Sequence, residues 1–125
     1  MFYLFSQNNS GGKFHIDERV ARYVIIEANS ADEANHIAES KGIYFGGVHD
    51  GRDCACCGDR WYPAWSAGTE EPLIYDRKPQ EFKDMFARPG EPYCHIYLLD
   101  GLQKTYRKPE RDERKRLPYE RKRLK

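Results

Sequence analysis

The sequence has no long apolar run, and none approaches the roughly 18 residues that a membrane-spanning helix needs. Its opening stretch, MFYLFSQNNSGG, has neither the basic start nor the apolar length of a secretory signal peptide. It shows no internal repeat and no G-x-S-x-G, H-E-x-x-H or phosphate-binding lysine motif. These absences predict a cytosolic protein with no membrane partner, no catalytic residues and no enzymatic activity.

Cysteine is scarce and unevenly placed. Of the four cysteines, Cys54, Cys56 and Cys57 fall within four residues of one another. Cysteines so close together cannot easily form the widely spaced bridges of a secreted disulfide scaffold. Their spacing therefore favours reduced thiols, or thiolates bound to a metal, in a cytosolic protein.

The residues that are present suffice for one domain and a tail. A chain of 125 residues leaves little room for a second core, and an aromatic content of 14% predicts a core rich in aromatic side chains. Residues 107–125 hold ten Lys/Arg against four Asp/Glu, which leaves a net charge of −5 on residues 1–106. We predict a single α+β domain over residues 1–106 and a basic, mobile extension over residues 107–125.

The apolar pattern predicts an antiparallel sheet. Aromatic and β-branched residues crowd into residues 2–6 and 22–28, which we expect to pair as a hairpin with a wide connection. A second hairpin is expected around Asp100-Gly101, a dipeptide that suits a two-residue type I′ turn. The strands that flank this turn lie within residues 92–99 and 102–107. Two further short strands are expected at residues 43–45 and 72–75.

One main helix should pack on this sheet. Ser30 and Glu33 form an S-x-x-E capping box, in which the Ser30 hydroxyl accepts from the Glu33 amide and the Glu33 side chain returns to the Ser30 amide. Apolar residues at helical spacing continue to Lys41, and Gly42 suits the left-handed position beyond the last turn. A short second helix is expected over residues 78–86, with its apolar residues on one face.

In residues 46–68 the apolar residues follow neither a helical nor a strand pattern. This segment contains three cysteines and both tryptophans. A structureless loop of this length in a compact domain is typically functional or organised by something such as a metal. Within it, the C-x-x-C-G step of Cys54 and Cys57 directs two thiolates at one ion while the glycine permits the turn. The sequence therefore predicts a zinc site in the loop. The remaining ligands would come from Cys56, His49, Cys94 and His95.

Two other interpretations of the cysteines stay open. They are free thiols packed inside the domain, or Cys54 and Cys57 form a redox pair. The redox interpretation lacks the helix start that usually acidifies such a thiol, because the following GDRWYPAW is not typical of one.

Ligand-binding candidates follow the cysteines directly. Asp59, Arg60, Trp61 and Tyr62 offer an acceptor, a planar cation and two aromatic faces, a set that could stack and hydrogen-bond a base or nucleotide. The alternative is that the two aromatic residues cover the core while Asp59 and Arg60 pair with each other or with solvent.

Two further segments offer weaker sites. The loop containing Asn8, Asn9 and Ser10 could present amides to a phosphate, although no helix follows it and a connecting loop is the favoured interpretation. The basic tail, together with Arg60, Trp61 and Tyr62, supports nucleic-acid binding as an alternative function, against the commoner explanation of a solvated charged end.

Two segments, FYLFSQNNSGGKF and ANHIAESKGIYFGGVHDGRDCACCGDRWYP, resemble a family of small uncharacterised bacteriophage proteins that share the QNNSGG loop and the C-x-CCGDRWYP motif. The resemblance implies a phage accessory protein that acts in the bacterial cytosol. Such proteins commonly disable a host factor or sequester a nucleotide signal used in defence. We therefore expect a non-enzymatic binding module for a host protein or a small nucleotide ligand.

Overall fold

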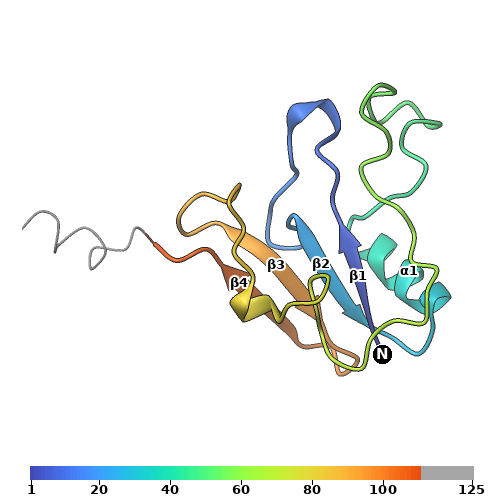
Figure 1. Cartoon of the computed structure of the whole chain (residues 1–125). Coiled ribbons are helices and arrows are strands. Elements are labelled where there is room, and N and C mark those ends of the chain that lie inside the picture. The colour runs from blue at the N-terminus through green and yellow to red at the C-terminus, as the bar shows by residue number, and fades with distance from the viewer. Residues whose placement is uncertain (111–125) are drawn as a thin grey trace, which may run out of the picture.

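The computed structural model describes residues 1–110, which form a four-stranded sheet and one α-helix (Figure 1). This confirms the predicted α+β class. From the predicted tail, residues 111–125 lie outside the described residues. The strands are β1 (Phe2–Ser6), β2 (Tyr23–Glu27), β3 (Pro92–Tyr97) and β4 (Gln103–Arg107). The helix is α1 (Ala31–Ser40), and two single 3-10 turns are η1 (Ser10–Gly12) and η2 (Pro79–Glu81).

The sheet has the order β1-β2-β3-β4. Both predicted hairpins form, because β1 is antiparallel to β2 and β3 is antiparallel to β4. The central pair β2 and β3 is parallel, so the expectation of a wholly antiparallel sheet was wrong at its centre. Parallel neighbours need a long crossover, and the chain between these strands supplies one that contains α1 and the Gly46–Gly68 loop.

The core lies on both faces of the sheet. Along β2, Val24 and Ile26 pack with α1 and Trp61 on one face, while Tyr23 and Ile25 pack into a second cluster on the other. In Figure 1, α1 covers the first face and the segment that contains η2 covers the second. A strand buried on both faces explains why β2 is apolar at successive positions instead of alternating.

Helix α1 begins and ends as predicted, with one change at its start. The Ser30 hydroxyl accepts from the Glu33 amide (3.1 Å), but the Glu33 carboxylate accepts from the Asn29 amide (2.7 Å) in place of Ser30. Gly42 has a φ of +100°, the left-handed conformation expected beyond the last turn. No helix within residues 1–110 is long and apolar enough to cross a membrane. The side chains that α1 buries fully are Ala34 and Ala38.

Three shorter predicted elements were wrong. Residues 43–45 form no strand, and in residues 72–75 only Ile74 makes an isolated bridge. The expected helix over residues 78–86 is a single 3-10 turn, Pro79–Glu81. The Asp84 side chain is buried and forms an ion pair with Arg22 at 2.6 Å. The apolar spacing that predicted the helix gave no sign of this contact. Met85 and Phe86 are consequently exposed.

The turn between β3 and β4 is one residue wider than predicted. The Leu98 amide donates to the Leu102 carbonyl, and the Gly101 amide donates to the Leu98 carbonyl, both at 2.9 Å. This pattern encloses the three residues 99–101 and places Gly101 at a φ of +92°. Three-residue hairpin loops commonly end on such a left-handed residue, so the Asp-Gly pair serves a bulged turn instead of a type I′ turn.

Candidate metal centre

The Gly46–Gly68 loop contains no helix or strand, as expected, and it carries the three clustered cysteines. In Figure 1 the loop (green) rises beside the loop that follows β1 (blue). Hydrogen bonds between the two loops, described below, show that they are in contact.

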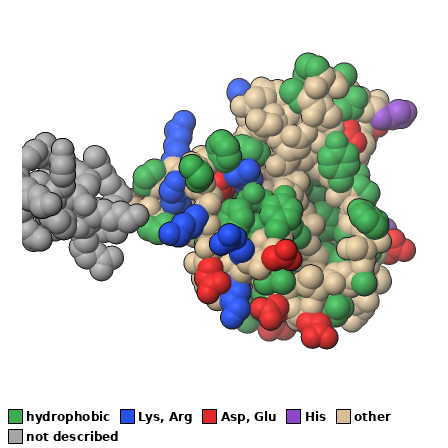
Figure 2. Space-filling model, viewed as in Figure 1, with side chains coloured by type: hydrophobic (Ala, Val, Ile, Leu, Met, Phe, Trp, Pro, Cys, Tyr) green, Lys and Arg blue, Asp and Glu red, His purple; other side chains and the backbone are tan. Residues whose placement is uncertain are grey.

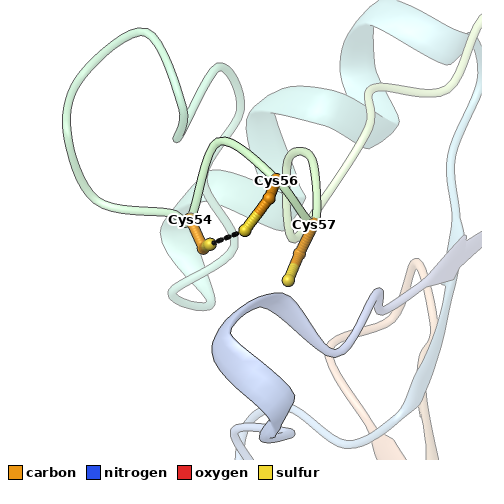
Figure 3. A group of neighbouring side chains, drawn as sticks. All are labelled: Cys54, Cys56 and Cys57. Atoms are coloured by element: carbon orange, nitrogen blue, oxygen red, sulfur yellow. Dashed lines mark hydrogen bonds between the residues drawn. The ribbon is translucent and has the colours of Figure 1, made fainter.

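The three clustered thiols converge on one space. Their Sγ atoms all lie within 4.8 Å of one another, and those of Cys54 and Cys56 are 2.8 Å apart (Figure 3). The Cys57 and Gly58 amides both donate to the Cys54 carbonyl at 3.1 Å, and Gly58 adopts a φ of +87°. The sequence therefore predicted both the tight turn and the role of its glycine.

The surroundings of Cys54 make it acidic. The Cys56 thiol hydrogen-bonds to Cys54, and with the amides of Cys56 and Cys57 it lowers the pKa of Cys54 to about 7. The same hydrogen bond raises the pKa of Cys56. A large share of Cys54 is therefore thiolate near neutral pH, the form that binds metals.

The structure does not bring the other predicted ligands to this cluster. Within residues 1–110 the metal-competent group consists of the three loop cysteines alone. Cys94 lies in the core on β3, where burial raises its pKa to about 12. The His49 side chain is 93% exposed and lies beside Asp50. Cys94 and His49 were therefore wrong as ligands.

His95 was also wrong as a ligand, because both of its ring nitrogens have partners inside the fold. Nδ1 lies 2.9 Å from the Thr105 hydroxyl and Nε2 lies 2.8 Å from the Asp17 carbonyl. Burial lowers the pKa of His95, so the neutral ring is favoured. This neutral histidine connects β3 to β4 and to the loop before β2.

The QNNSGG loop supports the cysteine turn. The Asn8 side-chain amide donates to the Cys57 carbonyl (2.7 Å), and the Ser10 hydroxyl accepts from the Cys54 amide (2.9 Å). The main-chain amides of Asn8 and Ser10, which the sequence offered to a phosphate, donate instead to the carbonyls of Arg60 (2.8 Å) and Asn8 (2.9 Å). Asn9 is exposed and has no such contact within residues 1–110.

Below the cysteine turn, Arg60 is buried and joins the two loops. Its guanidinium donates to the carbonyls of Lys13 (2.6 Å) and Ser10 (2.8 Å) and to the Gln7 side chain (2.9 Å). Its main-chain amide donates to Asp53, whose side chain is wholly buried.

Asp53 completes this buried pair and stays ionised. Burial acts to raise its pKa, but hydrogen bonds from the Tyr44 hydroxyl (2.7 Å) and the Arg60 amide (2.8 Å), with the nearby Arg60 charge, outweigh burial and lower it. Tyr44 is a residue that sequence reasoning missed, because the predicted strand at residues 43–45 gave no reason to place its hydroxyl on a carboxylate.

The predicted stacking surface after the cysteines is largely internal. Arg60 is buried as described, Trp61 is 1% exposed in the core, and Asp59 accepts from the Val48 amide at 2.9 Å. Only Tyr62, at 57% exposure, faces solvent. The structure therefore does not present Asp59, Arg60 and Trp61 as a stacking surface. Of the alternative, the core position is correct for Trp61 and wrong for the exposed Tyr62, while Asp59 and Arg60 contact the Val48 amide and Asp53 instead of each other.

Comparison with known proteins found one family. A family model described as Domain of unknown function (DUF7296) matches residues 1–114. This match includes every described residue and both motif segments. The chain matches no curated protein and no solved structure.

Proposed function

Because this chain belongs to the DUF7296 family, whose description assigns no activity, we propose a function from the geometry of its loop. The protein is a non-enzymatic binding module that holds a zinc ion on Cys54, Cys56 and Cys57 and binds a partner protein at the Gly46–Gly68 loop. The observation that carries this proposal is the convergence of three thiols within 4.8 Å on a surface loop.

The spacing of the sulfurs suits a thiolate-bound zinc. Tetrahedral coordination with Zn–S bonds of about 2.3 Å separates the sulfurs by roughly 3.8 Å. The Cys54 and Cys56 Sγ atoms, now 2.8 Å apart, would separate by about 1 Å to reach this spacing, and all three Sγ atoms already lie within 4.8 Å of one another. The acidity of Cys54 supplies one thiolate near neutral pH, and the ion would favour deprotonation of the other two.

The incomplete set of zinc ligands supports a role in binding a partner protein over a purely structural role for the metal. Structural zinc sites have four protein ligands, whereas this cluster supplies three within residues 1–110. Cys56 and Cys57 are exposed, so a ligand from another molecule can reach the open position. A partner side chain at that position would make association depend on the metal.

The resemblance to phage proteins supports a host protein as this partner, with the chain acting as a phage accessory protein in the bacterial cytosol. Inhibition of a host or defence factor by stoichiometric binding fits a small domain of this kind. Sequestration of a nucleotide is less well supported, because Arg60 and Trp61 are buried and cannot stack on a base.

Native mass spectrometry with added Zn²⁺ tests the metal site. We expect one zinc per chain in the parent protein and none in a variant with Cys54→Ser, Cys56→Ser and Cys57→Ser. Cys94→Ser is the matched control, since that thiol lies in the core, and it should leave zinc binding unchanged. Absence of zinc from the parent protein, or equal binding by the triple variant, would refute the site.

A thiol redox role is the second candidate, because the pKa of Cys54 near 7 suits a nucleophile as well as a ligand. The two functions differ in their response to metal. A redox pair should equilibrate with glutathione as dithiol and disulfide at a defined potential, and zinc should inhibit it. If zinc does not bind while a reversible disulfide forms at Cys54, the redox function is favoured.

A further inference from the structure

The outer edge of β1 is open over part of its length. In an antiparallel pair, main-chain groups of successive residues point to opposite sides of the strand. The Gln7 amide donates to the Arg22 carbonyl at 2.7 Å, which places the main chain of Gln7 on the β2 side. Phe2, Leu4 and Ser6 therefore direct their N–H and C=O groups away from β2.

The chain closes this edge at both ends and leaves the middle open. Phe2 and Thr69 exchange two main-chain hydrogen bonds (2.8 and 2.9 Å), and the Asn8 amide donates to the Arg60 carbonyl (2.8 Å). Between these points, Leu4 and Ser6 have no main-chain partner on the outer side within residues 1–110.

A contact with α1 keeps the edge open. The Asn35 side chain accepts from the Ala64 amide (2.7 Å) and donates to the Ala64 carbonyl (3.0 Å). These bonds hold the segment between Arg60 and Thr69 against the helix, away from Leu4 and Ser6.

The space left beside the edge is a groove of about 370 Å³, within the usual range for ligand sites. We call it the β1 groove. Trp65, which is 89% exposed, and Tyr62 lie on the side of the 62–66 segment, and Tyr75 lies opposite. The Tyr75 hydroxyl donates to Ser6 Oγ at 2.9 Å, and its backbone has a φ of +56°, which is unusual for a residue with a side chain.

Among the described residues, those that line the groove carry no charge. Figure 2 shows hydrophobic side chains gathered over the middle of this view, with acidic side chains mainly along its lower rim. Unpaired N–H and C=O groups on a strand edge match the main chain of an extended peptide, and the aromatic walls match apolar side chains. An uncharged lining disfavours phosphates and strongly charged peptides, because it offers them no counter-charge.

We infer that the β1 groove binds a short, extended, uncharged peptide segment of a partner protein, which adds to the β1 edge as a strand at Leu4 and Ser6. The pairing of Phe2 with Thr69 shows that this edge already accepts an antiparallel neighbour. The groove shares residues 62–68 with the Gly46–Gly68 loop, but the inference does not rest on a bound metal ion.

Selection of random linear peptides displayed on a surface, with the full chain as target, supplies the probe. The tightest peptide is then synthesised for titration. Amide hydrogen exchange should show fast exchange at Leu4 and Ser6 in the free protein and protection when this peptide is bound. If these two amides are already protected in the free protein, or if binding leaves their exchange unchanged, the inference fails.

Variants at Ser6 separate main-chain pairing from side-chain contact. Ser6→Pro removes an N–H that faces the groove and also the Ser6 hydroxyl that accepts from Tyr75. The bonds between β1 and β2 remain, and peptide affinity should fall about tenfold. Ser6→Ala loses the same hydroxyl but keeps the N–H, so it should bind more tightly than Ser6→Pro. Equal affinity for the two variants would contradict strand addition.

A second pair of variants tests the aromatic side chains that line the groove. These variants leave β1 unchanged, so they test the inference even if Ser6→Pro fails to fold. Trp65→Ala should weaken binding about tenfold, since Trp65 is exposed at the groove. Phe86→Ala removes another exposed aromatic side chain, outside the groove, and should bind as the parent does. Failure to select any peptide, or equal affinity for these two variants, would overturn the inference.

Discussion

Arg60 is the residue on which the candidate site depends most. It is surrounded by acceptors from the QNNSGG loop and lies above the buried Asp53 carboxylate, with Arg60 Nε 3.8 Å from Asp53 Oδ1. Removing one partner of a buried ion pair leaves the other charge without compensation, which typically costs about 3–5 kcal/mol.

Arg60→Met should therefore lower the free energy of unfolding by about 3–5 kcal/mol, measured by urea denaturation. Arg77→Met is the matched control, because Arg77 is exposed and should change stability by less than about 0.5 kcal/mol. A similar small change for Arg60→Met would show that the two loops do not need this residue.

His95 should make stability depend on pH. Burial lowers its pKa below the usual value of about 6.5, so below that pH the unfolded chain takes up a proton that the folded chain resists. The stabilising contribution is complete above that pH and is lost as the pH falls toward the pKa of the folded state.

Denaturation of the parent protein between pH 7.5 and 5 should accordingly show a decline that His95→Gln makes shallower. His36→Gln is the control, since the His36 side chain is 84% exposed and should leave the decline unchanged. An unchanged slope in His95→Gln would show that other groups, such as His15, whose pKa burial also lowers, cause the dependence.

At the candidate site, the sequence predicted the turn and not its surroundings. The C-x-x-C-G spacing is local, so the tight turn and the role of Gly58 could be predicted from it. The positions of Arg60 and Trp61 depend on contact with the QNNSGG loop, which is distant in sequence, and no local pattern reports that contact. His95 shows the same limit, because its partner Asp17 lies on another segment.

At the scale of single elements, the start of α1 depends on one hydroxyl. Ser30 accepts the Glu33 amide at 3.1 Å, one of the helix donors that would otherwise lack a partner. Ser30→Ala should cost about 1 kcal/mol of stability, measured by urea denaturation. Ser40→Ala at the other end removes only a bond to the Ile37 carbonyl, so a loss equal to that of Ser30→Ala would contradict the capping role.

The sequence predicted the helices and strands that local residue patterns specify. It did not predict those that depend on contacts between distant segments. Dense β-branched and aromatic residues specified β1 and β2, and the capping box specified α1. Residues 78–86 were expected to form a helix, but they form only a single 3-10 turn, and Asp84 pairs with the distant Arg22. The parallel pairing of β2 and β3 likewise depends on the crossover, which strand composition does not reveal.

At the scale of the whole molecule, the described residues contain both core clusters and all four strands. The last strand ends at Arg107, and the Lys108 amide still donates to the Glu91 carbonyl at 2.9 Å. The fold should therefore require little beyond residue 110.

A chain that ends at Glu110 is expected to keep the midpoint of thermal unfolding of the full chain, measured by circular dichroism. A fall of more than about 4 °C, which corresponds to roughly 1 kcal/mol in a domain of this size, would show that residues 111–125 stabilise the fold.

The same truncation tests the alternative of nucleic-acid binding, because it removes eight Lys/Arg and three Asp/Glu. If the tail carries that function, the full chain should bind DNA with a steep salt dependence that the truncated chain lacks. Equal, salt-insensitive binding by both chains would exclude the tail as the nucleic-acid site.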